Sequence, residues 1–162
     1  SAAASDVYKR QMSLGIKYGI EIIEEKIQVD ESTSVDNACN YLKTIGASAV
    51  LRLPGDIPNI EAKDIDLLIN EGKHDGVSII VPSDSGTGTN AFYKCPPDVI
   101  SSSFGENSFQ KHIKSFITKD IKFKVMEIEN ISLDIDSLED ISKIKKTSKQ
   151  SKTTDYLRLS SL

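Results

Sequence analysis

The sequence has no tryptophan, only two cysteines and no long hydrophobic run. Cys39 and Cys95 lie far apart and neither belongs to a Cys-x-x-Cys pair, so they indicate neither a disulfide framework nor a zinc site. No apolar stretch approaches the roughly 20 residues that a membrane span requires, and no hydrophobic signal segment stands at the start. We therefore expect a reduced, cytoplasmic protein that makes no membrane contact.

A strong excess of one charge is also lacking. The 20 Lys and Arg residues against 24 Asp and Glu residues leave a net charge of −4, which gives no general attraction for nucleic acid or anionic lipid. An anionic ligand would therefore have to be held by local groups. The 162 residues, 38% of them hydrophobic, suit one domain with a real core. A homodimer is left open.

The two ends of the chain differ from its middle. Residues 1–11 (SAAASDVYKRQ) look foreign to the rest of the chain, so we interpret them as a non-native leader. Residues 12–144 carry the pattern of a folded domain. Residues 145–162 are rich in Lys, Ser and Thr with few apolar side chains, which predicts a flexible tail rather than a second module.

Short apolar stretches alternate with segments of helical periodicity, which predicts an α/β domain with a mostly parallel sheet flanked by helices. In such sheets ligands bind at the carboxyl ends of the strands. Asn59 and Gly72 are placed to begin and end one helix, and the spacing of Ser137 and Asp140 is typical of a capping box. The expected strands are 19–24, 47–53, 77–81, 91–94 and 121–128, and the expected helices are 34–45, 60–70, 108–118 and 137–144.

Three aspartates are candidate metal ligands. Asp56 follows an apolar strand in PGDIP, and Asp134 and Asp136 stand in LDIDS. Mg²⁺ takes oxygen ligands, usually one or two carboxylates together with substrate phosphates. In an extended Asp-x-Asp the side chains point to opposite faces, so one can reach a metal while the other braces a loop or caps the next helix. The alternative for Asp56 is an ordinary turn residue, which we weigh as equal.

The loop 83–90 is rich in Gly, Ser and Thr, and its exposed backbone N–H groups suit a phosphate or a carboxylate. It matches G-x-G-x-x-A from Gly86 to Ala91. A dinucleotide site would need a helix to begin at the loop, whereas the adjoining AFYKCPP is β-like, and the GK[ST] of a P-loop is missing. A flexible loop without a ligand is the equal alternative.

The segment FGENSFQKHI carries a further candidate anion site. Gly105 allows close backbone approach, Asn107 is a candidate cap, and Ser108 would begin a helix whose first N–H groups are unpaired. For His112 we favour a solvated position on the helix, because no partner Asp or Cys is arranged around it. His74, in a turn, is expected at the surface.

Four segments in this order, GDIP at 55–58, GTGTNA at 86–91, FGENSFQKH at 104–112 and LDIDSLEDI at 133–141, resemble the signature of a known family. They are similar to the 2-phospho-L-lactate or phosphoenolpyruvate guanylyltransferases of deazaflavin coenzyme F420 biosynthesis. The resemblance extends over about 19–143, and the agreement of four separated motifs makes it specific.

The resemblance implies a nucleotidyltransferase fold of the glycosyltransferase-A-like kind. GTP and the phosphorylated acid would react with Mg²⁺, and pyrophosphate would leave. By motif position, Thr89, Gly105 and Ser108 would bind the acid. Asp56 would be catalytic and would bind metal together with Asp134, with Asp136 as the weaker third ligand. Positioning and charge neutralisation suffice for such a transfer.

The chain also departs from this family. Members begin with a strand and a basic loop that hold the nucleotide triphosphate, and nothing similar precedes Met12, so we expect a partial domain that lacks its nucleotide-binding part. Asp36 stands where members tend to have Leu, and for that reason Asn37 is not a site candidate. Two alternatives remain: a molybdopterin or sugar nucleotidyltransferase with the same fold, and a noncatalytic remnant that binds the acid.

Overall fold

The structure is a computed structural model that describes residues 2–25, 27, 29–146 and 151–159. The chain divides into two compact units, Ser1–Asp30 and Glu31–Leu162. The first consists of helix α1 (Ala2–Lys17) and an irregular segment in which Ile20, Ile27 and Val29 are exposed. The strand expected at 19–24 is wrong. Strands need a hydrogen-bonded neighbour, and among the described residues no strand pairs with this segment.

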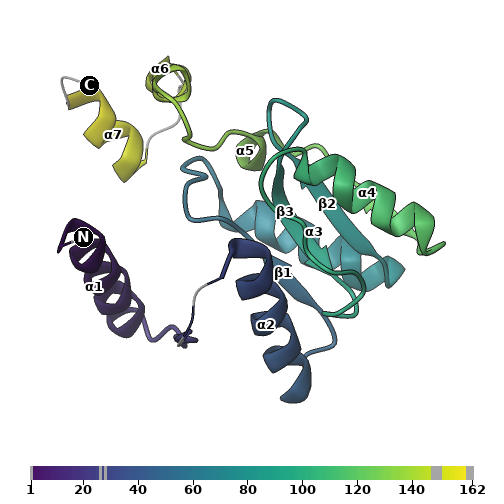
Figure 1. The fold of residues 1–162 in the computed structure, drawn as a ribbon. Coiled ribbons are helices and arrows are strands. Elements are labelled where there is room, and N and C mark those ends of the chain that lie inside the picture. Colours follow the sequence, from purple (N-terminus) through teal and green to yellow (C-terminus); the bar gives the residue numbers. More distant parts are fainter. Residues whose placement is uncertain (1, 26, 28, 147–150, 160–162) are drawn as a thin grey trace. The chain divides into compact units, whose positions relative to one another are not determined.

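The second unit is built on a four-stranded sheet of order β1-β3-β2-β4 (Figure 1). Its α/β class is confirmed, but the sheet is mixed rather than mostly parallel. Strands β2 and β4 pair in parallel, whereas β3 pairs antiparallel with both β1 and β2. The short loop between β2 and β3 returns the chain directly, and such a connection can only join antiparallel strands. The bounds are β1 (Val50–Arg52), β2 (Ser78–Pro82), β3 (Thr89–Lys94) and β4 (Phe123–Val125).

The four expected helices form, and α4 has the predicted bounds. Helix α3 begins after Glu61, which forms a capping box with Asp64, so Asn59 is not the cap. Gly72 lies inside α3, which ends at Gly76. The capping box of Ser137 and Asp140 is confirmed. The helices of this unit are α2 (Glu31–Thr44), α3 (Ala62–Asp75), α4 (Ser108–Thr118), α5 (Glu129–Ser132), α6 (Leu138–Lys146) and α7 (Lys152–Leu159).

Helix α7 lies in the segment for which the sequence predicted a flexible tail, and its Thr154 and Leu157 are buried. Helix α1 runs through the expected boundary between residues 11 and 12. Whether residues 1–11 are a non-native leader stays a prediction. Among the described residues, no helix is both long enough and apolar enough to cross a membrane.

The sheet is covered on both faces. Ile79 and Val81 of β2 belong to one buried cluster together with Leu68 of α3, whereas Ile80 belongs to a second cluster with Phe116 of α4. This alternation follows from the two-residue period of a strand. Figure 1 shows α3 and α4 on opposite sides of β2 and β3. Because both faces are closed, ligands can approach the sheet only at its edges or at the ends of its strands.

Gly72 provides a test of this packing. A methyl group at Gly72 would overlap the ring of Tyr93, which is only 4% exposed. We expect Gly72→Ala to lower the free energy of unfolding by about 1–3 kcal/mol, although alanine favours helices more than glycine does. Urea denaturation measures this change. Adding Tyr93→Leu should recover part of the loss, and strictly additive effects would contradict the overlap.

Candidate functional site

A cleft of about 1130 Å³ opens at the ends of β1 and β2, where three loops and the start of α4 meet. The six residues predicted from the sequence all line it. They come from four separate segments of the chain, which the sheet brings together. The six are Asp56, Thr89, Gly105, Ser108, Asp134 and Asp136.

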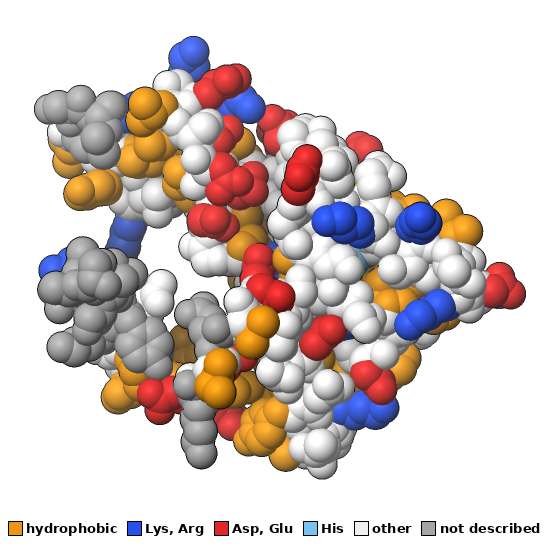
Figure 2. Space-filling view, in the orientation of Figure 1, with side chains coloured by type: hydrophobic (Ala, Val, Ile, Leu, Met, Phe, Trp, Pro, Cys, Tyr) orange, Lys and Arg blue, Asp and Glu red, His pale blue; other side chains and the backbone are white. Residues whose placement is uncertain are grey.

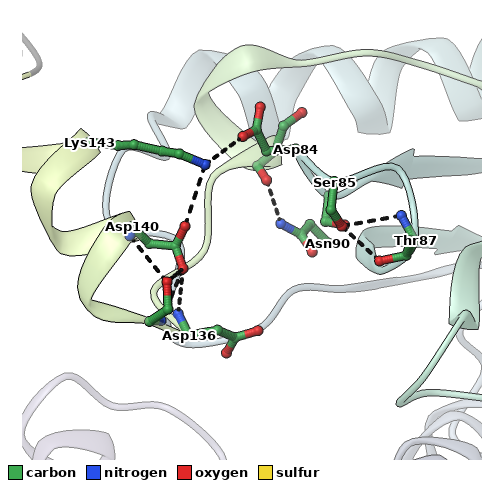
Figure 3. A network of polar contacts seen from close by, with 10 residues as sticks. Asp84, Ser85, Thr87, Asn90, Asp136, Asp140 and Lys143 are labelled. Carbon is green, nitrogen blue, oxygen red and sulfur yellow. Dashed lines mark hydrogen bonds and ion pairs between the residues drawn. The ribbon is translucent and has the colours of Figure 1, made fainter.

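The Gly-rich loop between β2 and β3 is held by its own polar groups. Gly88 N–H donates to Ser83 Oγ over 2.9 Å, and Ser83 N–H donates to the Gly88 carbonyl over 3.0 Å. Ser85 and Thr87 share a hydroxyl contact of 2.7 Å (Figure 3). The loop is also joined to α4, because Phe109 N–H donates to the Thr87 carbonyl over 3.0 Å. It is therefore a defined wall of the cleft.

Helix α4 begins at the cleft. Gly105 has a φ of 94°, a left-handed conformation that glycine adopts without strain. Asn107 is the residue before the helix, as predicted, but its side chain makes no cap hydrogen bond. Ser108, the first helical residue, is 2% exposed and lines the cleft. The N–H groups of Ser108 and Phe109 already donate to the carbonyls of Gly105 and Thr87, but the helix start still carries a partial positive charge, so this part of the cleft favours anions.

Asp36 of α2 fixes both β3 and the segment before α4 to this helix. Lys94 of β3 is 1% exposed and lies 3.0 Å from an oxygen of Asp36. Ser102 donates to the same carboxylate through its N–H and its hydroxyl. Burial alone would raise the pKa of Asp36, but the hydrogen bonds from Ser102 and Lys94 outweigh it and lower that pKa. Phe104 N–H donates to Ser32 Oγ over 2.8 Å, so α2 anchors the loop at two points.

The solvated position expected for His112 is wrong. Its ring is fully buried, not solvated, and it is held at both nitrogens. Ser103 N–H donates to Nε2 over 2.8 Å, and Nδ1 lies 3.0 Å from the hydroxyl of Thr89. Sequence reasoning missed this because the partners are a hydroxyl and a backbone N–H, which leave no recognisable pattern. His74 is at the surface, as expected, with an 87% exposed side chain.

The opposite side of the cleft is acidic. Seven acidic and two basic side chains line the cleft as a whole, and five of the acidic ones are Asp56, Asp84, Asp134, Asp136 and Asp140. Figure 2 shows several red carboxylates along the middle of the view. The negative charge of Asp134, then burial and the charges of Asp56 and Asp140, raise the pKa of Asp136. Ile135 N–H donates to the Asp56 carbonyl over 3.1 Å, which holds the two aspartate segments together. Like charges so close favour a bound cation.

These carboxylates suit a hard divalent cation. They are oxygen donors, and their mutual repulsion would be relieved by positive charge. In the described parts of the chain no three His, Cys, Asp or Glu side chains are arranged around one metal position. Asp56, Asp134 and Asp136 therefore do not form a three-carboxylate metal site in this structure.

Among the polar residues of the cleft that were not predicted as site residues, three make contacts that join its walls. Lys143 of α6 lies 3.0 Å from a carboxylate oxygen of Asp84 and 3.6 Å from one of Asp140, and Figure 3 shows it between them. The Asn90 amide donates to the Ile131 and Ser132 carbonyls, which ties β3 to α5. Arg52 donates to the Thr89 carbonyl, pairs with Glu31 and lies over the ring of Phe104 at 4.2 Å. Apart from Asp140, their partners are distant in the sequence, so no local sequence pattern indicated these contacts.

The sequence matches the family described as "Guanylyl transferase CofC like" over residues 7–162. The chain belongs to this family. A phosphoenolpyruvate guanylyltransferase of Rubrobacter xylanophilus is 35% identical over 99 residues, which are 61% of this chain and 48% of that protein. A 2-phospho-L-lactate guanylyltransferase of Methanothermobacter thermautotrophicus is 29% identical over 157 residues, or 97% of this chain and 67% of that protein. The chain thus spans about half the length of the Rubrobacter relative.

The fold is shared with a solved structure from Desulfovibrio desulfuricans that is assigned as a nucleotide-diphospho-sugar transferase. The TM-score is 0.64 at 15% sequence identity, and the match covers 82% of this chain and 60% of the other. At this identity the likeness concerns the fold alone. It confirms the nucleotidyltransferase-like α/β fold, and the family match confirms the resemblance that the four motifs indicated.

The buried ring of His112 predicts a pH dependence of stability. Burial, followed by the charges of Lys94 and Arg52, lowers the pKa of His112 to about 4, against an ordinary value near 6.5. The unfolded chain therefore binds the proton first, and stability that is complete above about pH 6.5 is lost as the pH falls through about 4. Between about pH 7 and pH 4 this loss amounts to about 3 kcal/mol.

The measurement compares the free energy of unfolding of the wild type with that of His112→Gln, which cannot titrate. The advantage of the wild type should shrink by up to about 3 kcal/mol on acidification. Parallel pH profiles of the two proteins would show that the folded ring takes up a proton as readily as the unfolded one.

Proposed function

We propose that this chain forms the acid-binding and metal-binding part of a guanylyltransferase, which transfers GMP from GTP to 2-phospho-L-lactate or phosphoenolpyruvate. One observation carries the proposal. A single cleft has carboxylates on one side, and hydroxyls with the start of a helix on the other. A cation-bound triphosphate and an anionic acceptor need these two surfaces next to each other. The reaction belongs to coenzyme F420 biosynthesis, and we place it in the cytoplasm.

The acid is assigned to the side of the cleft that is formed by Thr89, Gly105 and Ser108. These residues offer a hydroxyl, a close backbone approach and the N-terminus of α4. Arg52, which is paired with Glu31, lies next to Thr89 and is the basic side chain on this side of the cleft. A phosphate and a carboxylate separated by one carbon atom would both find donors here, and no deep apolar pocket is required for so small a ligand.

The metal, Mg²⁺, is assigned to Asp56 and Asp134, with Asp136 beside them. Bound there, Mg²⁺ would neutralise the triphosphate and the charge that develops on the leaving group. The residues on this side otherwise orient the two reactants. Asp56 follows β1, and the backbone bond from Ile135 keeps the Asp134 segment against it.

The reaction that this arrangement serves is a displacement at phosphorus. A phosphate oxygen of the acid attacks the α-phosphorus of GTP, and the bond from that phosphorus to the bridging oxygen breaks. Pyrophosphate leaves with the electron pair, and the product joins GMP to the acid through a diphosphate. The acid phosphate is already an anion, so the protein needs to supply no covalent nucleophile.

The test is an assay with Mg²⁺, GTP and each acid, read by mass spectrometry, on this chain and on the natural gene product. A guanosine diphosphate adduct with release of pyrophosphate is expected from the natural gene product. Preference for CTP or UTP would favour another nucleotidyltransferase instead. Binding of acid without pyrophosphate release from the natural gene product would favour a noncatalytic acid-binding protein.

Asp56→Asn tests the metal assignment. We expect turnover in the natural gene product to fall at least about a hundredfold, because the amide cannot neutralise a divalent cation. The urea midpoint should stay unchanged, since asparagine forms turns as readily as aspartate. Asp66→Asn, at an exposed position of α3 outside the cleft, is the matched control and should retain full turnover. Equal activity of both variants would remove Asp56 from the site.

A further inference from the structure

His112 does not line the cleft, yet both of its ring nitrogens have polar partners. The ring is fully buried and packs between Phe92 and Phe104, with centroid distances of 5.0 and 5.1 Å. A core histidine needs only shape and satisfied nitrogens. Here one of the satisfied nitrogens contacts Thr89, to which the acid is assigned.

The hydrogen bond from Ser103 determines where the ring carries its proton. A backbone N–H can only donate, so Nε2, 2.8 Å from Ser103 N, has to be the acceptor and is unprotonated. A neutral imidazole then carries its hydrogen on Nδ1. That nitrogen lies 3.0 Å from Thr89 Oγ1. His112 is therefore the donor and the Thr89 oxygen the acceptor in this contact.

The surroundings keep the ring neutral. Burial is the largest cause that lowers the pKa of His112, to about 4, and the positive charges of Lys94, Arg52 and Lys111 act in the same direction. Only Asp36 opposes them. A protonated ring would also lose the bond from Ser103, because Nε2 would no longer accept. Near neutral pH the ring thus has one tautomer and one direction of donation.

This direction constrains the Thr89 hydroxyl. The side chain is 5% exposed and β-branched, so its rotamer is restricted, and its oxygen already accepts from Nδ1. The hydroxyl proton has to point elsewhere, and Thr89 borders the cleft. We propose that His112 is a positioning residue that presents the Thr89 hydroxyl as a hydrogen-bond donor to an anionic oxygen of the phosphorylated acid.

The proposal rests on the proposed function, because it needs the acid on this side of the cleft. The positioning role adds a rule for ligand specificity to the proposed function. A hydroxyl fixed as donor favours a carboxylate or phosphate oxygen over a ligand group that must itself donate. Such orientation is set before the ligand arrives and costs no rearrangement on binding.

The first arm of the test is the tautomer itself. NMR of the chain labelled with ¹⁵N-histidine shows which ring nitrogen carries hydrogen, and only His74 and His112 contribute signals. His74→Asn assigns them. We expect His112 to be neutral with its hydrogen on Nδ1 near neutral pH, both with and without phosphoenolpyruvate. Hydrogen on Nε2, or a charged ring, would overturn the proposal.

The second arm measures the affinity for phosphoenolpyruvate and for 2-phospho-L-lactate by calorimetry with Mg²⁺ present. His112→Gln can place its amide oxygen near Nε2 and keep the bond from Ser103, but it removes the donor to Thr89. His112→Asn has the opposite effect. We expect affinity to fall about tenfold in His112→Gln and in Thr89→Val, and less in His112→Asn. A purely structural role would not distinguish the two amides in this order.

A double variant, Thr89→Val with His112→Gln, tests whether His112 acts through Thr89. If His112 acts through Thr89, then Thr89→Val with His112→Gln should bind no more weakly than Thr89→Val alone. Unchanged affinity in His112→Gln with weak binding by Thr89→Val would overturn the positioning role and leave the acid site in place. Failure of the wild type and the natural gene product to bind either acid would overturn the proposed acid site, and the positioning role with it.

Discussion

The burial of β2 and β3 on both faces is the constraint on which the site depends. With α3 on one side and α4 on the other, polar groups can meet a ligand only where these strands end. The β2–β3 loop lies there, and its bond to Phe109 brings the start of α4 to the same place. The segment after β1 reaches it through the contact of Asp56 with Ile135. One cleft thus collects residues from 31 to 143.

One side of this cleft is negatively charged and the other carries the partial positive charge of a helix start. The carboxylates around Asp136 repel one another, whereas the start of α4 carries a partial positive charge. Neither side alone suits a transfer between two phosphorylated molecules. Next to each other they suit the cation-bound nucleotide and the anionic acceptor of the proposed function. Local arrangement provides this despite a net charge of −4, because the field at a site depends on its nearest groups.

The sequence predicted those features that depend on residues close together in the chain. Helix α4 and the Ser137 capping box were correct because periodicity and cap spacing reside in adjacent residues. All six predicted site residues line the cleft. Asp56 was found from its place after a strand, where ligands bind in such sheets, whereas Thr89, Gly105 and Ser108 were assigned to the acid from the resemblance of their motifs to the family. The mixed sheet was missed although the short β2–β3 loop already requires these two strands to be antiparallel. The pairing of β1 with β3 and of β2 with β4 joins segments that are distant in the sequence, and no local pattern marks it. His112 was missed for the same reason: its partners lie 9 and 23 residues away and are a backbone N–H and a hydroxyl.

The proposed division of the cleft into a cation side and an acid side can be tested directly in this chain by NMR with Mn²⁺ as a paramagnetic substitute for Mg²⁺. In the presence of phosphoenolpyruvate, the amide signals of 55–57 and 133–137 should broaden first, and those of 105–109 should shift without equal broadening. Strongest broadening near the carboxylates Glu71 and Asp75 of α3, outside the cleft, with 55–57 and 133–137 unaffected, would contradict the assignment of the metal to the acidic side of the cleft.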